Sequence, residues 1–191
     1  MAIPKSAVAI AALIALAASG CTQPDPNAKP TYACTPSDGG TPQPCYKAEH
    51  DLQVKEDALY TEAEAVYRKF LAEDERINRS GGASAASPVL TETTTGTYLA
   101  SAVAVYKALK AAKATATGGE FKIAWIHREP RLTREDSLAA MTACTDTSSV
   151  QMASKGKKPR PGTIGEQTVY FVRQDGRLKI ADGTYRWVDQ C

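Results

Sequence analysis

The stretch Gly118-Gly119-Glu120-Phe121-Lys122-Ile123-Ala124-Trp125-Ile126-His127 divides the chain into a helical half and a sheet half. Before it, apolar residues recur at the spacing of an α-helix, about 3.6 residues per turn. After it, they alternate with polar residues at a period of two, which is typical of a half-buried β-strand. Phe121, Ile123, Trp125 and His127 are therefore expected on one side of a first strand. Helices followed by a run of antiparallel strands indicate an α+β fold.

Two helices are expected in the first half. No Gly or Pro occurs from Tyr46 to about Ile77, where apolar residues follow helical spacing at Leu52, Leu59, Ala63, Val66, Tyr67, Phe70 and Leu71. Ser80-Gly81-Gly82 is a typical helix end. We expect a loop over residues 81–97 and a second helix from about Tyr98 to Ala114.

Three more strands are expected in the second half. Residues 136–145 suit a strand, although their alanines also suit a helix, and residues 150–153 are expected to continue this strand past a bend. Residues 163–173 alternate clearly. Asp175-Gly176 is a strong hairpin signal, which leads into a last strand that begins at Arg177 and bends near Gly183.

The N-terminus carries the features of an export signal. Lys5 precedes residues 6–17, an uncharged run of mostly Ala, Val, Ile and Leu that is too short for a bilayer-spanning helix. Ala18-Ser19-Gly20-Cys21 resembles the lipobox of bacterial lipoproteins, with Ala18 where leucine is preferred. We therefore expect residues 1–20 to be a signal peptide and Cys21 to be acylated, which places the protein on the outer face of the cytoplasmic membrane. The alternative is an ordinary secretory signal.

The expected mature chain contains a tether and one domain. Residues 21–45 are rich in proline and are expected to be extended, and residues 46–191 are long enough for one domain with a core. Without residues 1–20 the chain has 22 basic and 21 acidic side chains, which does not favour nucleic-acid binding. The basic cluster Lys155–Arg160 is expected to be a solvated loop, with contact to acidic lipid or wall polymer as the alternative.

The cysteine positions favour one disulfide pairing. Acylation of Cys21 would leave four of the five cysteines on the oxidising side of a membrane. Cys34 and Cys45 flank a short segment of turn-forming residues, and Cys191 ends a chain whose last strands belong to the sheet that contains Cys144. We expect the pairs Cys34–Cys45 and Cys144–Cys191.

Several short motifs resemble the nuclear transport factor 2-like superfamily in its secreted and lipid-anchored members. They are Ala65–Leu71 in the long helix, Ala143-Cys144-Thr145-Asp146-Thr147-Ser148, the hairpin Asp175–Ile180 and terminal Cys191. The resemblance implies a cone-shaped α+β fold, in which N-terminal helices pack on a curved antiparallel sheet around a pocket. It implies no single activity, because this fold carries enzymes and binding modules alike.

No catalytic or metal-binding signature stands out. Asp146 and His127 are weak catalytic candidates, and Asp146 also suits a backbone-capping role before Ser148. Asp136, Asp182, Tyr170 and Tyr185 are further ingredients of a ketosteroid isomerase-like site. Tyrosines at helical spacing are expected in the core or at a pocket rim, and they are Tyr60, Tyr67, Tyr98 and Tyr106. We expect no metal and no cofactor.

The favoured function is non-catalytic binding of an envelope protein partner or a small apolar ligand by a lipid-anchored protein. The alternatives are a ketosteroid isomerase-like enzyme, a component of a conjugation or secretion apparatus, and a phage-encoded surface protein.

Overall fold

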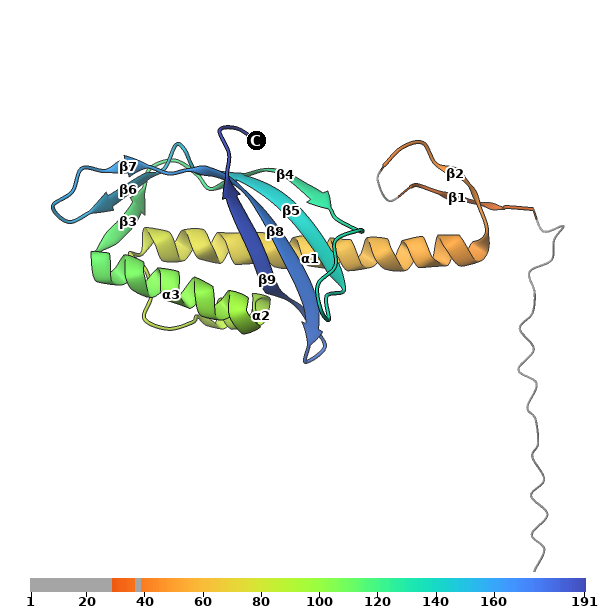
Figure 1. Cartoon of the computed structure of the whole chain (residues 1–191), viewed down its shortest axis with the longest axis horizontal. Coiled ribbons are helices and arrows are strands. Elements are labelled where there is room, and N and C mark those ends of the chain that lie inside the picture. Colours follow the sequence, from red (N-terminus) through yellow and green to blue (C-terminus); the bar gives the residue numbers. More distant parts are fainter. Residues whose placement is uncertain (1–28, 37–38) are drawn as a thin grey trace, which may run out of the picture.

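The computed structural model describes residues 29–36 and 39–191 (Figure 1). The expected signal peptide, Cys21 and the first part of the Pro-rich tether lie outside the described residues. Within the described residues, no helix is both long enough and apolar enough to cross a membrane.

Helix α1 (Lys47–Arg79) confirms the long helix expected from residue 46. The Glu49 carboxylate accepts a hydrogen bond from the Tyr46 backbone N–H at 2.8 Å, which satisfies one of the donors left free at a helix start. The buried face is centred on aromatic and small residues, and it comprises Tyr60, Ala63, Tyr67, Phe70, Glu73 and Ile77. Leu52 is 65 % exposed, so the apolar stripe does not reach the first turns.

Helix α3 (Gly96–Ala112) confirms the second expected helix, but the loop expected over residues 81–97 is wrong in part. It contains the short helix α2 (Pro88–Thr93). The Ser87 hydroxyl accepts a hydrogen bond from the Leu90 N–H at 3.2 Å, and Pro88 occupies the first helical position. Ser-Pro is a helix-start signal here rather than loop punctuation.

The main sheet has four antiparallel strands in the order β4-β5-β8-β9. They are β4 (Lys122–Arg128), β5 (Ala139–Asp146), β8 (Ile164–Gln174) and β9 (Arg177–Trp187). The expected hairpin between β8 and β9 is confirmed. Asp175 and Gly176 have φ angles of 52° and 75°, as the two central residues of a type I′ turn require. Helices and an antiparallel sheet make the fold α+β, as expected.

A second sheet of three short strands was not expected. Its order is β3-β6-β7, with β3 (Ala114–Thr117), β6 (Gln151–Ser154) and β7 (Arg160–Pro161). Residues 150–153 therefore do not continue β5, because a turn closed by the Val150 N–H on the Thr147 carbonyl at 2.9 Å redirects the chain. Lys113, with φ of 49°, ends α3 and leads directly into β3.

The three helices lie on one side of the curved main sheet (Figure 1). The core between them includes Tyr67 and Phe70 of α1, Tyr106 of α3, and Phe171 and Ile180 of the sheet. The α2–α3 junction is fixed to β9, because the Thr95 N–H donates to the Ile180 carbonyl at 2.8 Å.

Gly183 allows α3 to approach β9 closely. A Cβ atom at this position would lie 3.0 Å from Cε2 of Tyr98. The absence of a side chain therefore lets the Tyr98 ring pack on the strand. The bend expected at Gly183 is a bulge nearby, since the register of β8 and β9 shifts after the pair Tyr170–Asp182.

Both expected disulfides are confirmed. The Cα–Cα distances are 5.8 Å for Cys34–Cys45 and 5.7 Å for Cys144–Cys191, which are ordinary values for disulfides. Two disulfides indicate that the protein folds in an oxidising, extracytoplasmic compartment. Their positions show what each constrains: one closes a hairpin and the other holds the C-terminus on the sheet.

The Cys34–Cys45 bridge closes the small hairpin of β1 (Tyr32–Cys34) and β2 (Gln43–Cys45). The hairpin contacts the first turns of α1. The Gln53 side chain donates to the Thr35 carbonyl at 2.9 Å and accepts from the Thr35 N–H at 3.1 Å. The end of the tether next to the domain is thus folded and bonded to α1.

Candidate functional site

Two adjoining hollows lie among α1, α3, the end of the main sheet and the second sheet. Their volumes are about 400 Å³ and 370 Å³. Their linings share residues from α1, α3, β8 and β9, namely Phe70, Asp74, Val105, Gln167 and Tyr185. We refer to the two hollows together as the Asp74 cavity.

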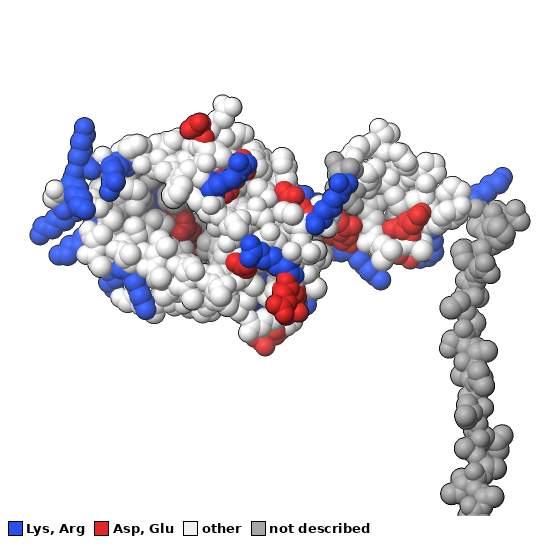
Figure 2. All heavy atoms as spheres, in the orientation of Figure 1, with Lys and Arg blue, Asp and Glu red and all other residues white. Residues whose placement is uncertain are grey.

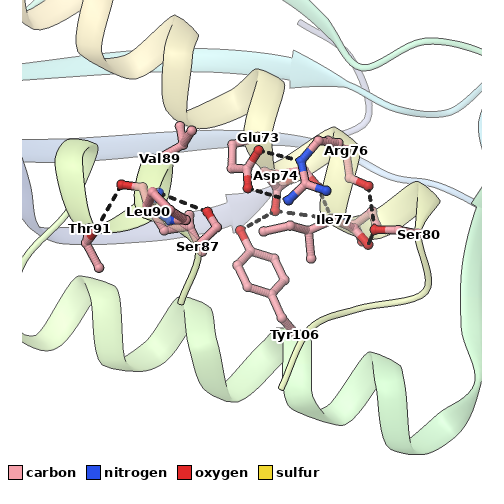
Figure 3. Close-up of polar contacts among 12 residues, drawn as sticks. Glu73, Asp74, Arg76, Ile77, Ser80, Ser87, Val89, Leu90, Thr91 and Tyr106 are labelled. Atoms are coloured by element: carbon pink, nitrogen blue, oxygen red, sulfur yellow. Dashed lines mark hydrogen bonds and ion pairs between the residues drawn. The ribbon is translucent and has the colours of Figure 1, made fainter. Parts of the chain in front are cut away.

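Asp74 is the shared acid of this cavity, and it projects from α1 toward α3 (Figure 3). Its Oδ1 accepts hydrogen bonds from the Tyr106 hydroxyl at 2.7 Å and from the Asn78 amide at 3.1 Å. Both bonds end on the same oxygen. Among the described residues, Oδ2 has no hydrogen-bond partner, and it is not among the buried polar atoms that lack one. Oδ2 is therefore an acceptor with some exposed surface, on a side chain that lines the cavity.

Burial raises the pKa of Asp74 from its ordinary 3.8 to about 6, because the surrounding protein penalises the charged form. The hydrogen bonds from Tyr106 and Asn78 oppose this shift, and the charge of Glu75 adds to it. The preceding residue behaves in the opposite way. Glu73 receives two hydrogen bonds from Arg76, at 2.6 and 2.7 Å, and these bonds lower its pKa. Asp74 has no such cationic partner to oppose the effect of burial, so the pKa of its carboxyl lies close to neutral pH.

Aromatic rings from two helices surround the carboxyl. The Phe70 ring meets the Tyr98 ring edge-on, with 5.4 Å between centroids, and Tyr67 lies 6.4 Å from Phe70. The Tyr67 hydroxyl donates to the Gln167 side chain at 3.4 Å. Burial raises the pKa values of Tyr67, Tyr98 and Tyr106, so these hydroxyls stay protonated. They are neutral hydrogen-bond donors at the edge of apolar surface.

The charge of the cavity wall is one-sided. The residues that line the two hollows include Asp74 and Asp182 but no Lys, Arg or His. Asp182 is neutralised from outside, because Arg134 pairs with its Oδ2 and the Gly183 N–H donates to its Oδ1 at 2.7 Å. Asp74 is thus the acid with a free oxygen in an otherwise uncharged, largely aromatic and aliphatic wall.

The weak catalytic candidates Asp146 and His127 do not meet. They lie at opposite ends of the β4–β5 pair, where Lys122 is opposite Asp146 and His127 is opposite Thr142. The Asp146 carboxylate accepts from the Ser148 N–H at 2.8 Å and from its hydroxyl at 2.6 Å, as the capping interpretation predicts. His127 is exposed and stacks on Trp125 with 4.4 Å between centroids. Neither side chain lines the Asp74 cavity.

The other residues suggested for a ketosteroid isomerase-like site do not lie together, but are divided between the surface, the core and the cavity. Asp136 is exposed, and Tyr170 is buried under the Arg134 guanidinium, 4.7 Å from the ring centroid. Asp182 and Tyr185 line the cavity. The helix tyrosines occupy both expected places, since Tyr60, Tyr67 and Tyr106 are buried while Tyr67, Tyr98 and Tyr106 also border the cavity.

Asp74 was missed by sequence reasoning, although a signal for it exists. It follows Phe70 by four residues and Tyr67 by seven, so it lies on the buried face of α1 at helical spacing. Its spacing from Tyr67, Phe70 and Ile77 is the signal that could have identified it, although Glu73 also lies on the buried face.

The described residues contain no group of three or more His, Cys, Asp or Glu side chains placed to hold a metal ion. What the arrangement can do chemically is bind a small molecule through aromatic contact and one carboxylate oxygen. The chain matches no protein-family model, and no curated protein matches it.

Proposed function

We propose that the chain is a lipid-anchored protein of the cell envelope, held at the outer face of the cytoplasmic membrane through Cys21, whose domain binds a small organic ligand in the Asp74 cavity. The observation that carries the binding function is the free Oδ2 of Asp74 inside a largely apolar hollow. A volume of about 400 Å³ suits a small ligand, and a few polar groups in an apolar lining are typical of such sites.

The ligand that fits this chemistry is an organic cation with an apolar or aromatic body. Above pH 6 the Asp74 carboxylate is mostly ionised, and the cavity wall supplies no basic side chain to neutralise it. Phe70 and Tyr98 offer aromatic surface beside it, which attracts cations as well as apolar groups. An anionic ligand would meet an uncompensated negative charge.

The arrangement of elements supports a cone-shaped, nuclear transport factor 2-like fold. Three helices lie on one side of a curved antiparallel sheet (Figure 1). The hollow is lined by residues of α1 and α3 and of the sheet strands β8 and β9. A pocket at this position is what the family resemblance implies. We favour binding over catalysis because Asp146 and His127 do not share a cavity.

Ligand binding is tested with benzyltrimethylammonium, its neutral carbon isostere neopentylbenzene, and benzoate, by calorimetric titration of the full-length protein in nonionic detergent. At pH 8 we expect the cation to bind at least about tenfold more tightly than the neutral isostere, which corresponds to about 1.4 kcal/mol. D74N should remove this preference, because asparagine keeps the acceptor but not the charge.

The matched control for D74N is D136N, which removes one exposed carboxylate outside the cavity and should leave binding unchanged. Tighter binding of benzoate than of the cation, or equal loss in both variants, would contradict the proposed ligand chemistry.

The anchor is tested by cell fractionation. Cys21→Ala removes the acylation site, and we expect this variant to carry no lipid. Globomycin inhibits cleavage of lipoprotein signals after the lipid is attached, so it should make an uncleaved, lipid-modified precursor accumulate in the membrane fraction. Metabolic labelling with a clickable palmitate analogue supplies the direct readout. Continued labelling of the Cys21→Ala variant would exclude Cys21 as the anchor.

A further inference from the structure

Seven basic side chains gather at one end of the domain. Three come from the last turns of α3 and its cap (Lys107, Lys110, Lys113) and four from the β6–β7 hairpin (Lys155, Lys157, Lys158, Arg160), and all are exposed. Antiparallel pairing of β3 with β6 places Ala114 opposite Ser154. Lys113 precedes Ala114 and Lys155 follows Ser154, so the two lysines lie at the same end of the sheet. We call these seven residues the basic tip. Figure 2 shows Lys and Arg gathered there, without acidic side chains among them on this face.

The charge of the basic tip is not compensated. No residue of the tip forms an ion pair within the described part of the chain, and Lys110 bonds only to the Ser84 hydroxyl, at 2.7 Å. The two segments that build the tip, residues 93–119 and 147–165, contain no Asp or Glu. Seven arginines elsewhere have carboxylate partners, namely Arg68, Arg76, Arg79, Arg128, Arg134, Arg173 and Arg186. A protein of nearly balanced total charge thus concentrates unpaired positive charge in one place.

The basic tip lies at the far end of the molecule from the β1–β2 hairpin, through which the chain leads to Cys21 (Figure 1). Helix α1, with 33 residues, spans most of this separation, about 50 Å at 1.5 Å per residue. Under the proposed anchoring, the tip can point away from the membrane that holds the protein.

The tip lacks the features of a membrane-inserting or base-stacking surface. Of the exposed large apolar side chains of the described residues, Val105 alone belongs to the two segments that build the tip, and it lines the Asp74 cavity. Surfaces that enter a bilayer interface carry Trp, Phe or Leu beside their cations, and single-stranded nucleic acids are held by aromatic stacking. The tip offers charge alone, mostly from lysines, which act as point charges without a fixed geometry.

We propose that the basic tip binds a linear anionic polymer of the cell envelope, a carboxylated or phosphorylated polysaccharide, by charge density alone. Several polymer charges contact several tip cations at once, and binding releases the counterions that the polymer had condensed. The site is separate from the Asp74 cavity and needs no ligand there. Its position would let a tethered protein hold both the membrane and the polymer beyond it.

The test measures binding of fluorescent polygalacturonate and of fluorescent long-chain polyphosphate to the full-length protein in nonionic micelles. We expect binding at low salt that falls steeply as NaCl rises, because each released counterion adds to the salt dependence. The triple variant K155Q/K157Q/K158Q should bind at least about tenfold more weakly. Preference for one polymer identifies whether carboxylate or phosphate is the favoured group.

The matched control is K29Q/K55Q/K122Q, which removes the same net charge from exposed lysines outside the tip. It should change affinity less than about twofold, since the polymer responds to local charge density. An equal loss of polymer affinity in the two triple variants would show that binding depends on the net charge of the protein and not on the tip, and would overturn the proposal. Micelles containing phosphatidylglycerol that displace the polymers completely at equal anion concentration would assign the tip to lipid and overturn it as well.

Discussion

Replacing Cys144 and Cys191 together by serine is expected to lower the free energy of unfolding by about 4 kcal/mol. The bridge closes a loop of 47 residues, and in the chain-entropy model a loop of this length costs the unfolded ensemble about that much conformational freedom. The bridge also fixes the C-terminus, where the Trp125 indole N–H donates to the Cys191 carbonyl at 3.1 Å. Guanidinium unfolding of the full-length protein, followed by tryptophan fluorescence and by circular dichroism, measures the loss.

The Cys34–Cys45 bridge provides the control. The hairpin that it closes contacts the domain through the exposed first turns of α1, as the Thr35–Gln53 hydrogen bonds show. Local opening there can occur without unfolding the core. We expect C34S/C45S to cost about 1 kcal/mol or less in the main transition. Equal losses in the two double variants would mean that the hairpin unfolds together with the domain.

The elements with strong local signals could be predicted from the sequence. Helix α1 lacks Gly and Pro over its whole length and has an apolar stripe from Tyr60 to Ile77. The Asp175-Gly176 turn requires the positive φ angles that this dipeptide accepts most readily. The disulfide partners followed from chain position, because few arrangements bring a C-terminal cysteine to the sheet. These features depend on residues that are near in sequence or constrained by topology.

The second sheet could not be predicted in the same way. Strands β3, β6 and β7 have four residues or fewer, and each is too short to show a clear period. Their pairing depends on the turn after Asp146 and on the left-handed backbone conformation of Lys113. Both depend on tertiary contacts that the local sequence does not reveal. The sequence showed one half of the basic tip, the cluster Lys155–Arg160. It did not show the whole tip, because the other half is about 40 residues away and the β3–β6 pairing brings the two together.

The candidate site shows a further limit of sequence reasoning. Asp146 and His127 attracted attention because they lie in a motif and on an alternating strand. In the structure Asp146 caps a turn at Ser148 and His127 stacks on Trp125, and neither lines the cavity. Asp74 lies between Glu73 and Glu75 in an acidic run that resembles a solvated helix face. Its burial depends on α3, since Tyr106 is 32 residues away in the chain and only tertiary packing brings its hydroxyl to the carboxyl.

Asp74→Asn is expected to stabilise the protein at neutral pH. The folded pKa of about 6 lies above the ordinary 3.8, so the folded state binds the proton more tightly than the unfolded state. The stability contributed by the protonated carboxyl is therefore fully present below about pH 4 and is lost as the pH rises through 6. Asparagine is neutral at every pH and can still accept the hydrogen bonds from Tyr106 and Asn78.

The predicted difference in the free energy of unfolding between D74N and the wild type is thus small near pH 4. It grows to about 3 kcal/mol in favour of D74N at pH 7.5, because each unit of pKa difference between the folded and unfolded states corresponds to about 1.36 kcal/mol. Guanidinium unfolding at half-unit pH intervals measures it, and other titrating groups cancel because both proteins share them. A constant difference across this range would show that the Asp74 carboxyl is not desolvated in the folded state.

The control D51N should show the opposite dependence. Its hydrogen bond with Lys47 lowers the pKa of exposed Asp51, so the stability that the ionised group contributes is present above the ordinary 3.8 and lost as the pH falls.

A bound cation is expected to stabilise the folded protein, because the ionised Asp74 carboxyl destabilises it at neutral pH. Saturating benzyltrimethylammonium should therefore raise the wild-type unfolding midpoint at pH 7.5 and narrow its gap to D74N, because pairing with a positive charge offsets the penalty that burial imposes on Oδ2.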